Sequence, residues 1–129
     1  MLEGINILVA DDNPLNQKVT KFMLSKQGAE VQTVSNGVEA VDMLLKYSYF
    51  HAVLIDIHMP LMDGFETTQY IRNDIKNNIP VIGLTADLLD NATEACIEAG
   101  MNACVCRPFD SDALSELILS MIKKNEVKN

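Results

Sequence analysis

Short apolar runs alternate along this chain with longer segments in which apolar residues recur every three or four positions. The runs predict β-strands, and the first of them is uninterrupted, as strands covered on both faces are. The longer segments have the spacing of amphipathic helices. The predicted strands are Ile5–Ala10, Ala29–Val34, Ala52–Ile55, Val81–Leu84 and Ala103–Cys106.

The first two predicted helices have clear start signals. Asn13 is a suitable N-cap, Pro14 favours the first helical turn, and Gly28 ends the first helix. Asn36, followed three residues later by Glu39, is a capping-box pattern for the second helix. The residues expected to face inward are Val19, Phe22, Met23 and Leu24 in the first helix and Val38, Val41, Leu44 and Leu45 in the second.

The third and fourth helices are marked in the same way. Asp63 with Glu66 forms one capping-box pattern, and Asn91 with Glu94 forms another. Gly100 is placed to close the fourth helix, because glycine readily adopts the left-handed conformation that often follows a helix.

The last helix is predicted to start near Asp110, and the polar segment 123–129 after it is predicted to be a linker stub. Five strand and helix pairs in succession predict an α/β fold with a doubly wound, five-stranded parallel sheet and helices on both faces. In such a sheet, ligands bind beyond the carboxyl ends of the strands. The inward face of the last helix is expected to be Leu114, Leu117, Ile118, Met121 and Ile122.

The composition fits one folded domain spanning residues 1–129. Hydrophobic residues make up 48% of the chain and charged residues 22%, which argues against disorder. No apolar run approaches the roughly 18 residues of a membrane span, and no secretory leader pattern opens the chain. We therefore expect a cytoplasmic domain without membrane contact. The net charge of −8 would repel a phosphate backbone and argues against direct nucleic-acid binding.

The three cysteines predict neither a disulfide framework nor a zinc site. Their number is odd, and Cys96, Cys104 and Cys106 lack the spacing of metal ligands. We expect buried, inert thiols.

Acidic residues follow two of the predicted strands. Asp11 and Asp12 come directly after the first strand, and Asp56 comes directly after the third. If these strands are parallel neighbours, the three carboxylates converge in one pocket, where like charges repel and lose hydration. Mg²⁺, which prefers oxygen ligands, is the simplest cation to hold them. Without Asp56, the pair Asp11 and Asp12 would equally fit a turn followed by a helix cap.

Five strings cover nearly the whole chain in a specific order: ILVADDNPLNQKV, AVLIDIHMPLMDGFE, VIGLTA, CIEAGMNA and CRPF. Together they resemble the receiver domain of two-component response regulators. The NPLNQKV and MPLMDG strings are most similar to receiver modules of hybrid sensor histidine kinases. The resemblance implies a flavodoxin-like sheet with the strand order 2-1-3-4-5.

The resemblance also implies a magnesium-dependent phosphoacceptor site. Asp56 would receive a phosphoryl group from the phosphohistidine of a histidine kinase or of a histidine phosphotransfer domain. Asp12 and Asp56 would bind Mg²⁺ directly, and Asp11 would assist through water. The backbone carbonyl of His58 would complete the protein ligands, whereas its imidazole is expected to be exposed.

By the same resemblance, Thr85 would donate a hydrogen bond to the phosphoryl group and Arg107 would contact it as a cation. The residue types agree with this chemistry, because a carboxylate that attacks phosphorus needs neighbouring charge to be neutralised. Relatives usually carry lysine at the position of Arg107 and an aromatic residue at that of Cys104. We expect Arg107 to pair with phosphoryl oxygens or with Asp11 and Asp12, and Cys104 to lack the aromatic switch.

We therefore predict a phosphoacceptor signalling domain of a phosphorelay that originates from a hybrid histidine kinase. Such a domain promotes its own phosphotransfer and dephosphorylation without being a conventional turnover enzyme. One alternative, motivated by Arg107 and Cys104, is a degenerate receiver that binds partners independently of phosphorylation. A second is a magnesium-dependent phosphohydrolase with an aspartyl nucleophile. It is disfavoured because His58 stands where those enzymes usually have a second acid.

Overall fold

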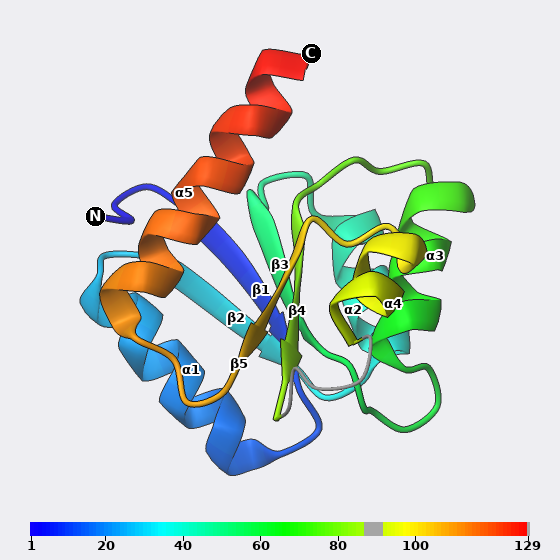
Figure 1. Ribbon diagram of the computed structural model, residues 1–129, viewed down its shortest axis with the longest axis horizontal. Coiled ribbons are helices and arrows are strands. Elements are labelled where there is room, and N and C mark those ends of the chain that lie inside the picture. Colours follow the sequence, from blue (N-terminus) through cyan, green and yellow to red (C-terminus); the bar gives the residue numbers. More distant parts are fainter. Residues whose placement is uncertain (87–91, 129) are drawn as a thin grey trace.

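The computed structural model describes residues 1–86 and 92–128. Its centre is a parallel sheet of five strands in the order β2-β1-β3-β4-β5, with helices on both faces (Figure 1). The predicted fold class and strand order are therefore confirmed. The strands are β1 (Asn6–Ala10), β2 (Glu30–Val34), β3 (Ala52–Asp56), β4 (Val81–Thr85) and β5 (Ala103–Cys106). The helices are α1 (Pro14–Lys26), α2 (Gly37–Lys46), α3 (Gly64–Asn73), α4 (Ala92–Ala99) and α5 (Ser111–Lys128).

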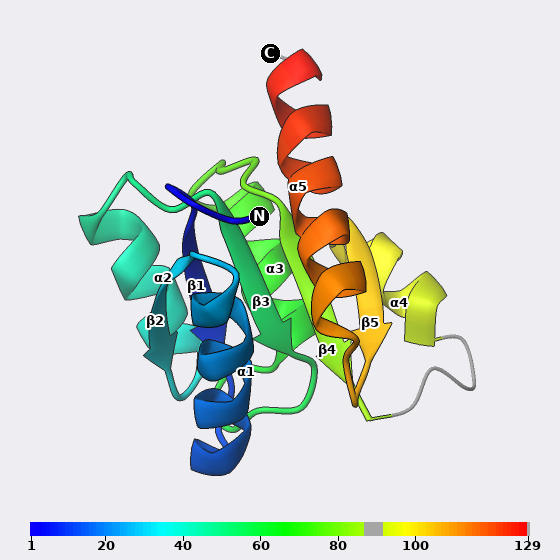
Figure 2. The same ribbon diagram turned by 90° about the vertical axis from the view of Figure 1, so that its left-hand side faces the viewer.

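The sheet separates two buried apolar clusters. Helices α1 and α5 cover one face, where Leu24 and Ile118 are buried against the strands (Figure 2). Helices α2, α3 and α4 cover the other face, where Leu44 and Ile71 are buried. Because both faces are covered, β3 and β4 are buried at every position, which explains their continuous apolar sequences.

The inward faces predicted for α1 and α2 are each wrong at two residues. Val19 and Phe22 of α1 are 49% and 62% exposed, and Val38 and Leu45 of α2 are also exposed. A helix turns by about 100° per residue, so Val19 and Phe22 lie about 100° and 160° around the axis from the buried Thr20. Each helix therefore meets the sheet along a narrower stripe than predicted. The buried residues are Thr20 and Leu24 in α1 and Gly37, Ala40, Val41 and Leu44 in α2.

The helix starts agree closely with the sequence signals. Asn13 caps α1 with its side-chain oxygen, and Asp63 with Glu66 forms a complete capping box at α3. At α2 the box is only half formed. The side chain of Asn36 accepts a hydrogen bond from the Glu39 N–H, but the Glu39 carboxylate accepts one from the residue before Asn36.

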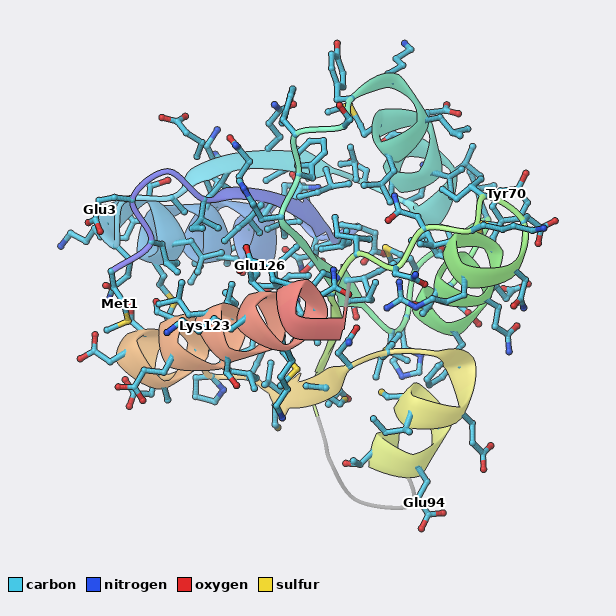
Figure 3. All side chains as sticks on the ribbon, turned by 90° about the horizontal axis from the view of Figure 1, so that it is seen from above. Met1, Glu3, Tyr70, Glu94, Lys123 and Glu126 are labelled. Atoms are coloured by element: carbon cyan, nitrogen blue, oxygen red, sulfur yellow. The ribbon has the colours of Figure 1, made fainter. Side chains whose placement is uncertain are left out.

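The ends of α4 and α5 add one confirmation and one correction. Gly100 follows α4 with a φ of 103°, the left-handed conformation expected of it, whereas the cap predicted at Asn91 lies outside the described residues. Helix α5 has its predicted inward face and continues to Lys128, with Lys123 exposed on its C-terminal half (Figure 3). The segment 123–128 is thus helical rather than irregular. Its role as a linker remains a prediction.

Gly64 allows the start of α3 to approach the end of β3. A Cβ atom at this position would lie 2.7 Å from the carbonyl oxygen of Asp56 and 2.8 Å from the Cα atom of Ile57. Both neighbours are backbone atoms that cannot rotate away. The Gly64 N–H donates to the Ile57 carbonyl at 2.9 Å, which closes the connection between β3 and α3.

Replacing Gly64 with alanine should lower the free energy of unfolding by about 1–3 kcal/mol, because the added methyl group overpacks this contact. Urea denaturation measures the loss. Asn73→Ala, exposed at the other end of α3, is the control and should change the free energy by less than about 0.5 kcal/mol. A Gly64→Ala protein as stable as the wild type would contradict the close approach.

Candidate functional site

Three carboxylates meet at the carboxyl edge of the sheet. Strands β1 and β3 are parallel neighbours, with Ala10 paired to Ile55, so the residues that follow them lie side by side. One carboxylate oxygen from each of Asp11, Asp12 and Asp56 lies within 4.8 Å of the other two. The convergence predicted from the sequence is therefore confirmed.

The three carboxylates differ in exposure and in local support. Asp11 is fully buried, Asp56 is 9% exposed, and Asp12 is exposed. Oδ1 of Asp11 accepts a hydrogen bond from the Asn13 backbone N–H at 2.9 Å. Oδ1 of Asp56 accepts one from the His58 N–H at 3.1 Å. These short-range bonds hold each carboxylate over the end of its strand.

Arg107 brings a cation from the end of β5 to the buried carboxylate. Its Nη2 atom forms an ion pair with Oδ2 of Asp11, and its side chain is 19% exposed. The Arg107 backbone N–H donates to the carbonyl of Thr85 at 2.8 Å, which joins the ends of β4 and β5. One of the two pairings expected for Arg107 is thus present.

Thr85 and His58 occupy the remaining predicted positions. Thr85 ends β4, between the strand of Asp56 and the strand that precedes Arg107, and it is 6% exposed. His58 follows β3 with an exposed side chain, as expected. All the predicted site residues therefore lie at one edge of the sheet, and their chemical roles remain predictions.

Gln17 supports the site, and the sequence analysis missed it. From the second turn of α1, its Nε2 atom donates to the backbone carbonyls of Asp11 and Val34 and approaches Oγ of Ser35 at 3.3 Å. These contacts tie α1 to the ends of β1 and β2 beside the acidic pair. The available signal was a long amide side chain about one turn after the N-cap Asn13.

Comparison with known proteins decides the family. The sequence profile of the response regulator receiver domain matches residues 7–119. The chain is a response regulator receiver domain. Probable histidine kinase 6 of Oryza sativa subsp. japonica is 36% identical over 141 aligned positions, which cover 95% of this chain and 14% of that protein. Sensor histidine kinase RcsC of Escherichia coli strain K12 is 37% identical, over 90% of this chain and 12% of that protein. The receiver domain thus spans 12% to 14% of the length of these relatives.

Solved receiver domains have the same fold. The receiver domain of sensor histidine kinase PA1611 from Pseudomonas aeruginosa PAO1, with a magnesium ion in its active site cleft, is 36% identical with a TM-score of 0.84. That match covers 93% of this chain and 98% of the other. A receiver domain from Clostridium thermocellum is 26% identical with a TM-score of 0.86, over 97% and 99% of the two chains.

Burial dominates the electrostatics of the predicted phosphoacceptor. It raises the pKa of Asp56 above its ordinary value, and the charges of Asp11 and Asp12 raise it further. The His58 N–H and the Arg107 guanidinium oppose these effects without cancelling them. The charged form of Asp56 is therefore held in the receiver domain at a cost, which a nearby cation would relieve.

The donor set of the receiver domain suits a hard divalent cation. Carboxylate oxygens are the ligands that Mg²⁺ prefers, and three of them lie close together with one guanidinium as their counter-charge. Among residues 1–86 and 92–128, no other group of acidic, histidine or cysteine side chains converges closely enough to hold a metal ion.

The three cysteines differ in burial. Cys96 is buried as predicted, whereas Cys104 and Cys106 are only half-buried. Burial, together with a hydrogen bond involving Cys96, raises the pKa of the Cys104 thiol to about 12. This thiol is therefore protonated at neutral pH and has little of the thiolate character needed for reaction.

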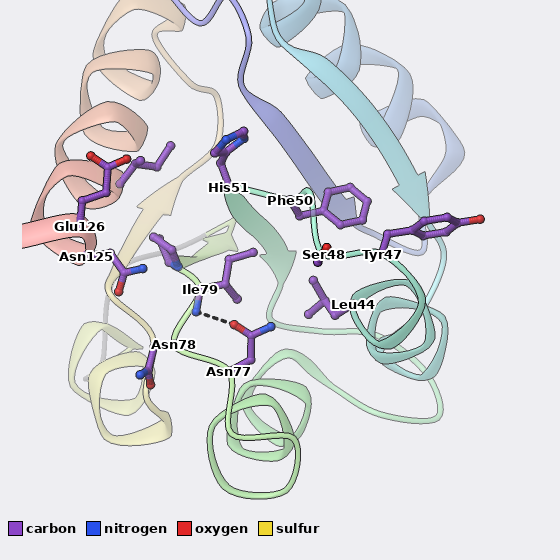
Figure 4. Close-up of a pocket in the computed structure, with 12 residues that line it drawn as sticks. Leu44, Tyr47, Ser48, Phe50, His51, Asn77, Asn78, Ile79, Asn125 and Glu126 are labelled. Atoms are coloured by element: carbon purple, nitrogen blue, oxygen red, sulfur yellow. Dashed lines mark hydrogen bonds between the residues drawn. The ribbon is translucent and has the colours of Figure 1, made fainter. Parts of the chain in front are cut away.

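A hollow of about 400 Å³ lies at the opposite edge of the sheet, and Phe50, Asn77 and Glu126 are among its lining residues (Figure 4). His51 also borders it, and its Nδ1 atom accepts a hydrogen bond from the Asn6 N–H at 2.9 Å. This bond joins the starts of β1 and β3 and gives His51 a structural role. None of the site carboxylates lines this hollow.

Asp56→Asn should raise the melting temperature of the metal-free receiver domain by a few degrees at neutral pH, because it removes the repulsion with Asp11 and Asp12. The pKa of Asp56 is higher in the folded than in the unfolded state. Wild-type stability should therefore rise as pH falls through that raised pKa, and the variant should lack this gain. Thermal unfolding in chelator from neutral to acidic pH measures both effects.

Asp42→Asn provides the matched control, because Asp42 is exposed on α2 away from the site. It should keep the wild-type dependence of stability on pH. An Asp56→Asn protein that is less stable than wild type in chelator would contradict the repulsion.

Proposed function

We propose that this receiver domain accepts a phosphoryl group on Asp56 from the phosphohistidine of a histidine kinase or histidine phosphotransfer domain. The observation that carries the proposal is the convergence of Asp11, Asp12 and Asp56 at the edge of the sheet where Thr85 and Arg107 also lie. Three like charges at this separation are costly unless a cation or a chemical task holds them in place.

The chemistry requires little beyond alignment and charge neutralisation. A carboxylate oxygen of Asp56 attacks phosphorus, a P–O bond forms as the P–N bond breaks, and the electron pair returns to the imidazole of the donor. The product is an acyl phosphate. Thr85 donates a hydrogen bond to a phosphoryl oxygen, and Arg107 contacts another as a cation.

Asp12, Asp56 and the backbone carbonyl of His58 would hold Mg²⁺, with Asp11 assisting through water. The magnesium ion in the PA1611 receiver domain, which is 36% identical to this chain, supports this proposal. When bound, the metal neutralises charge on the phosphoryl oxygens and on the attacking carboxylate. The hydrogen bond from the His58 N–H, two residues along the chain, orients the Asp56 carboxylate for metal binding.

An apolar surface beside the site suits a protein phosphodonor. Leu15, Val19 and Phe22 of α1 are 68%, 49% and 62% exposed and lie on one side of the helix. A hollow of about 410 Å³ continues this surface past Phe109 to Arg107. A phosphohistidine that reaches Asp56 brings its own domain over this surface, so we propose that the donor docks on it.

The whole protein is proposed to be a hybrid histidine kinase acting in a phosphorelay, because the relatives named above are histidine kinases of which this chain spans a small part. No helix among residues 1–86 and 92–128 is long and apolar enough to cross a membrane. The cytoplasmic location and the lack of direct nucleic-acid binding remain predictions.

A degenerate receiver remains the alternative that specific residues motivate. Arg107 replaces the usual lysine, and Cys104 supplies no aromatic ring in β5. A phosphohydrolase is a weaker alternative, because His58 stands where those enzymes usually have a second carboxylic acid.

Intact mass measured after incubation with Mg²⁺ and a small phosphodonor should increase by one phosphoryl group on Asp56. The modification should be lost in base, as expected for an acyl phosphate. Asp56→Asn and wild type in excess chelator should both remain unmodified. Modification of the Asp56→Asn protein would rule out the assignment, and an unmodified wild type would favour the degenerate receiver.

Phe22→Ala should slow phosphotransfer from a phosphohistidine protein by about tenfold, the effect of losing one aromatic contact worth about 1.4 kcal/mol at an interface. Labelling by a small phosphodonor should not change, because Phe22 lies outside the site. Leu45→Ala is the matched control, since Leu45 is 63% exposed on α2. Equal slowing by both variants, or slowing with the small donor as well, would contradict docking on α1.

A further inference from the structure

The only carboxylate of the acidic group that is fully buried is already paired with a cation of the chain. The side chain of Asp11 has no exposed surface, and its Oδ2 atom forms an ion pair with Nη2 of Arg107. A buried carboxylate without a counter-charge would be strongly unfavourable. Arg107 therefore compensates the charge of this buried carboxylate.

The same guanidinium has a second favourable neighbour outside the acidic group. The Cζ atom of Arg107 lies 5.7 Å from the centre of the Phe109 ring, within the range of a cation–π contact. The side chain is also partly exposed, at 19%. Arg107 can thus leave Asp11 without losing all of its stabilising contacts, because Phe109 and solvent are both within reach.

A divalent cation and this guanidinium compete for the same negative charge. The oxygens of Asp11, Asp12 and Asp56 lie within 4.8 Å of one another, so a cation held among them lies close to the Asp11 partner. Two positive centres a few ångströms apart in a partly buried site repel each other. Occupancy by one therefore weakens occupancy by the other.

We propose that Arg107 is a metal-responsive counter-ion: it holds Asp11 in the metal-free receiver domain, lowers the affinity for Mg²⁺, and is released from Asp11 when Mg²⁺ binds. The proposal rests on the proposed function in so far as it takes Mg²⁺ as the cation. The released guanidinium is then free at the mouth of the site, where the phosphoryl group arrives. The position of the Arg107 side chain therefore depends on whether Mg²⁺ is bound.

Arginine suits this role better than lysine would. A planar guanidinium is less strongly hydrated than an ammonium group, donates directed hydrogen bonds to a carboxylate and stacks on an aromatic ring. Both of its contacts here, Asp11 and Phe109, use these properties. A lysine at position 107 should pair less firmly with Asp11 and oppose Mg²⁺ less.

The direct test follows the side chain of Arg107 by NMR during Mg²⁺ titration without any phosphodonor. The chain contains two arginines, so Arg72 serves as an internal reference in the same spectrum. The Arg72 guanidinium lies away from the acidic group. It donates hydrogen bonds to the carbonyls of Gly100, Asn77 and Ile79 and to Oδ1 of Asn102. Mg²⁺ should shift the Nε–Hε signal of Arg107 and speed its exchange with solvent, while that of Arg72 stays in place.

The affinity for Mg²⁺ supplies the second readout, measured by isothermal titration calorimetry at constant ionic strength. Arg107→Gln should bind Mg²⁺ about tenfold more tightly than wild type, which corresponds to about 1.4 kcal/mol. Arg107→Lys should lie between the two. Lys123→Gln removes the same charge from an exposed position on α5 and should change the affinity by less than about twofold.

An Arg107 signal that is unaffected by saturating Mg²⁺ would overturn the proposal, and so would an Arg107→Gln protein that binds Mg²⁺ no more tightly than wild type. The wild-type spectrum decides the matter even if the variants fold poorly. Because no phosphodonor is present, these results are independent of whether Asp56 becomes phosphorylated. Failure of Mg²⁺ to bind at all would instead count against the proposed metal site.

Discussion

Repulsion among three carboxylates at one edge of the sheet is the constraint on which the rest of the site depends. Asp11 follows β1 and Asp56 ends β3, and both lose most of their hydration, yet folding holds them beside Asp12. This cost is offset by apolar burial in the two clusters on either side of the sheet. Because the fold keeps the three carboxylates together, it attracts cations to this edge of the sheet, and a phosphoacceptor needs this property.

The two arginines of the domain illustrate how the number and charge of partners set the role of a side chain. Arg72 donates to three backbone carbonyls and one amide oxygen, and this set of neutral partners ties the α3–β4 and α4–β5 connections together. Arg107 depends on one carboxylate and one ring. Its position therefore responds to any other charge that reaches Asp11, whereas the position of Arg72 does not.

The precision of the site comes from residues that carry no charge. Gly64 permits backbone contact between α3 and the end of β3, and Gln17 links α1 to the strand ends next to Asp11. The apolar side of α1 that includes Phe22 is exposed because the helix turns its buried residues, Thr20 and Leu24, toward the sheet. Positioning of the site and the proposed docking of the donor thus use different side chains of one helix.

The sequence by itself determined the α/β fold class and the starts of α1 and α3, because these follow from local periodicity and capping patterns. The strand order that brings the acidic residues together came from the resemblance to receiver domains. Asp56 and Asp11 had to meet once β1 and β3 were neighbours. Only the tertiary structure decided that Phe22 faces solvent, since periodicity defines an apolar side of a helix but not its rotation on the sheet. It also decided that Asp11 is the carboxylate of the acidic pair with which Arg107 forms its ion pair, because the two lie 96 residues apart and their contact depends on how β5 ends.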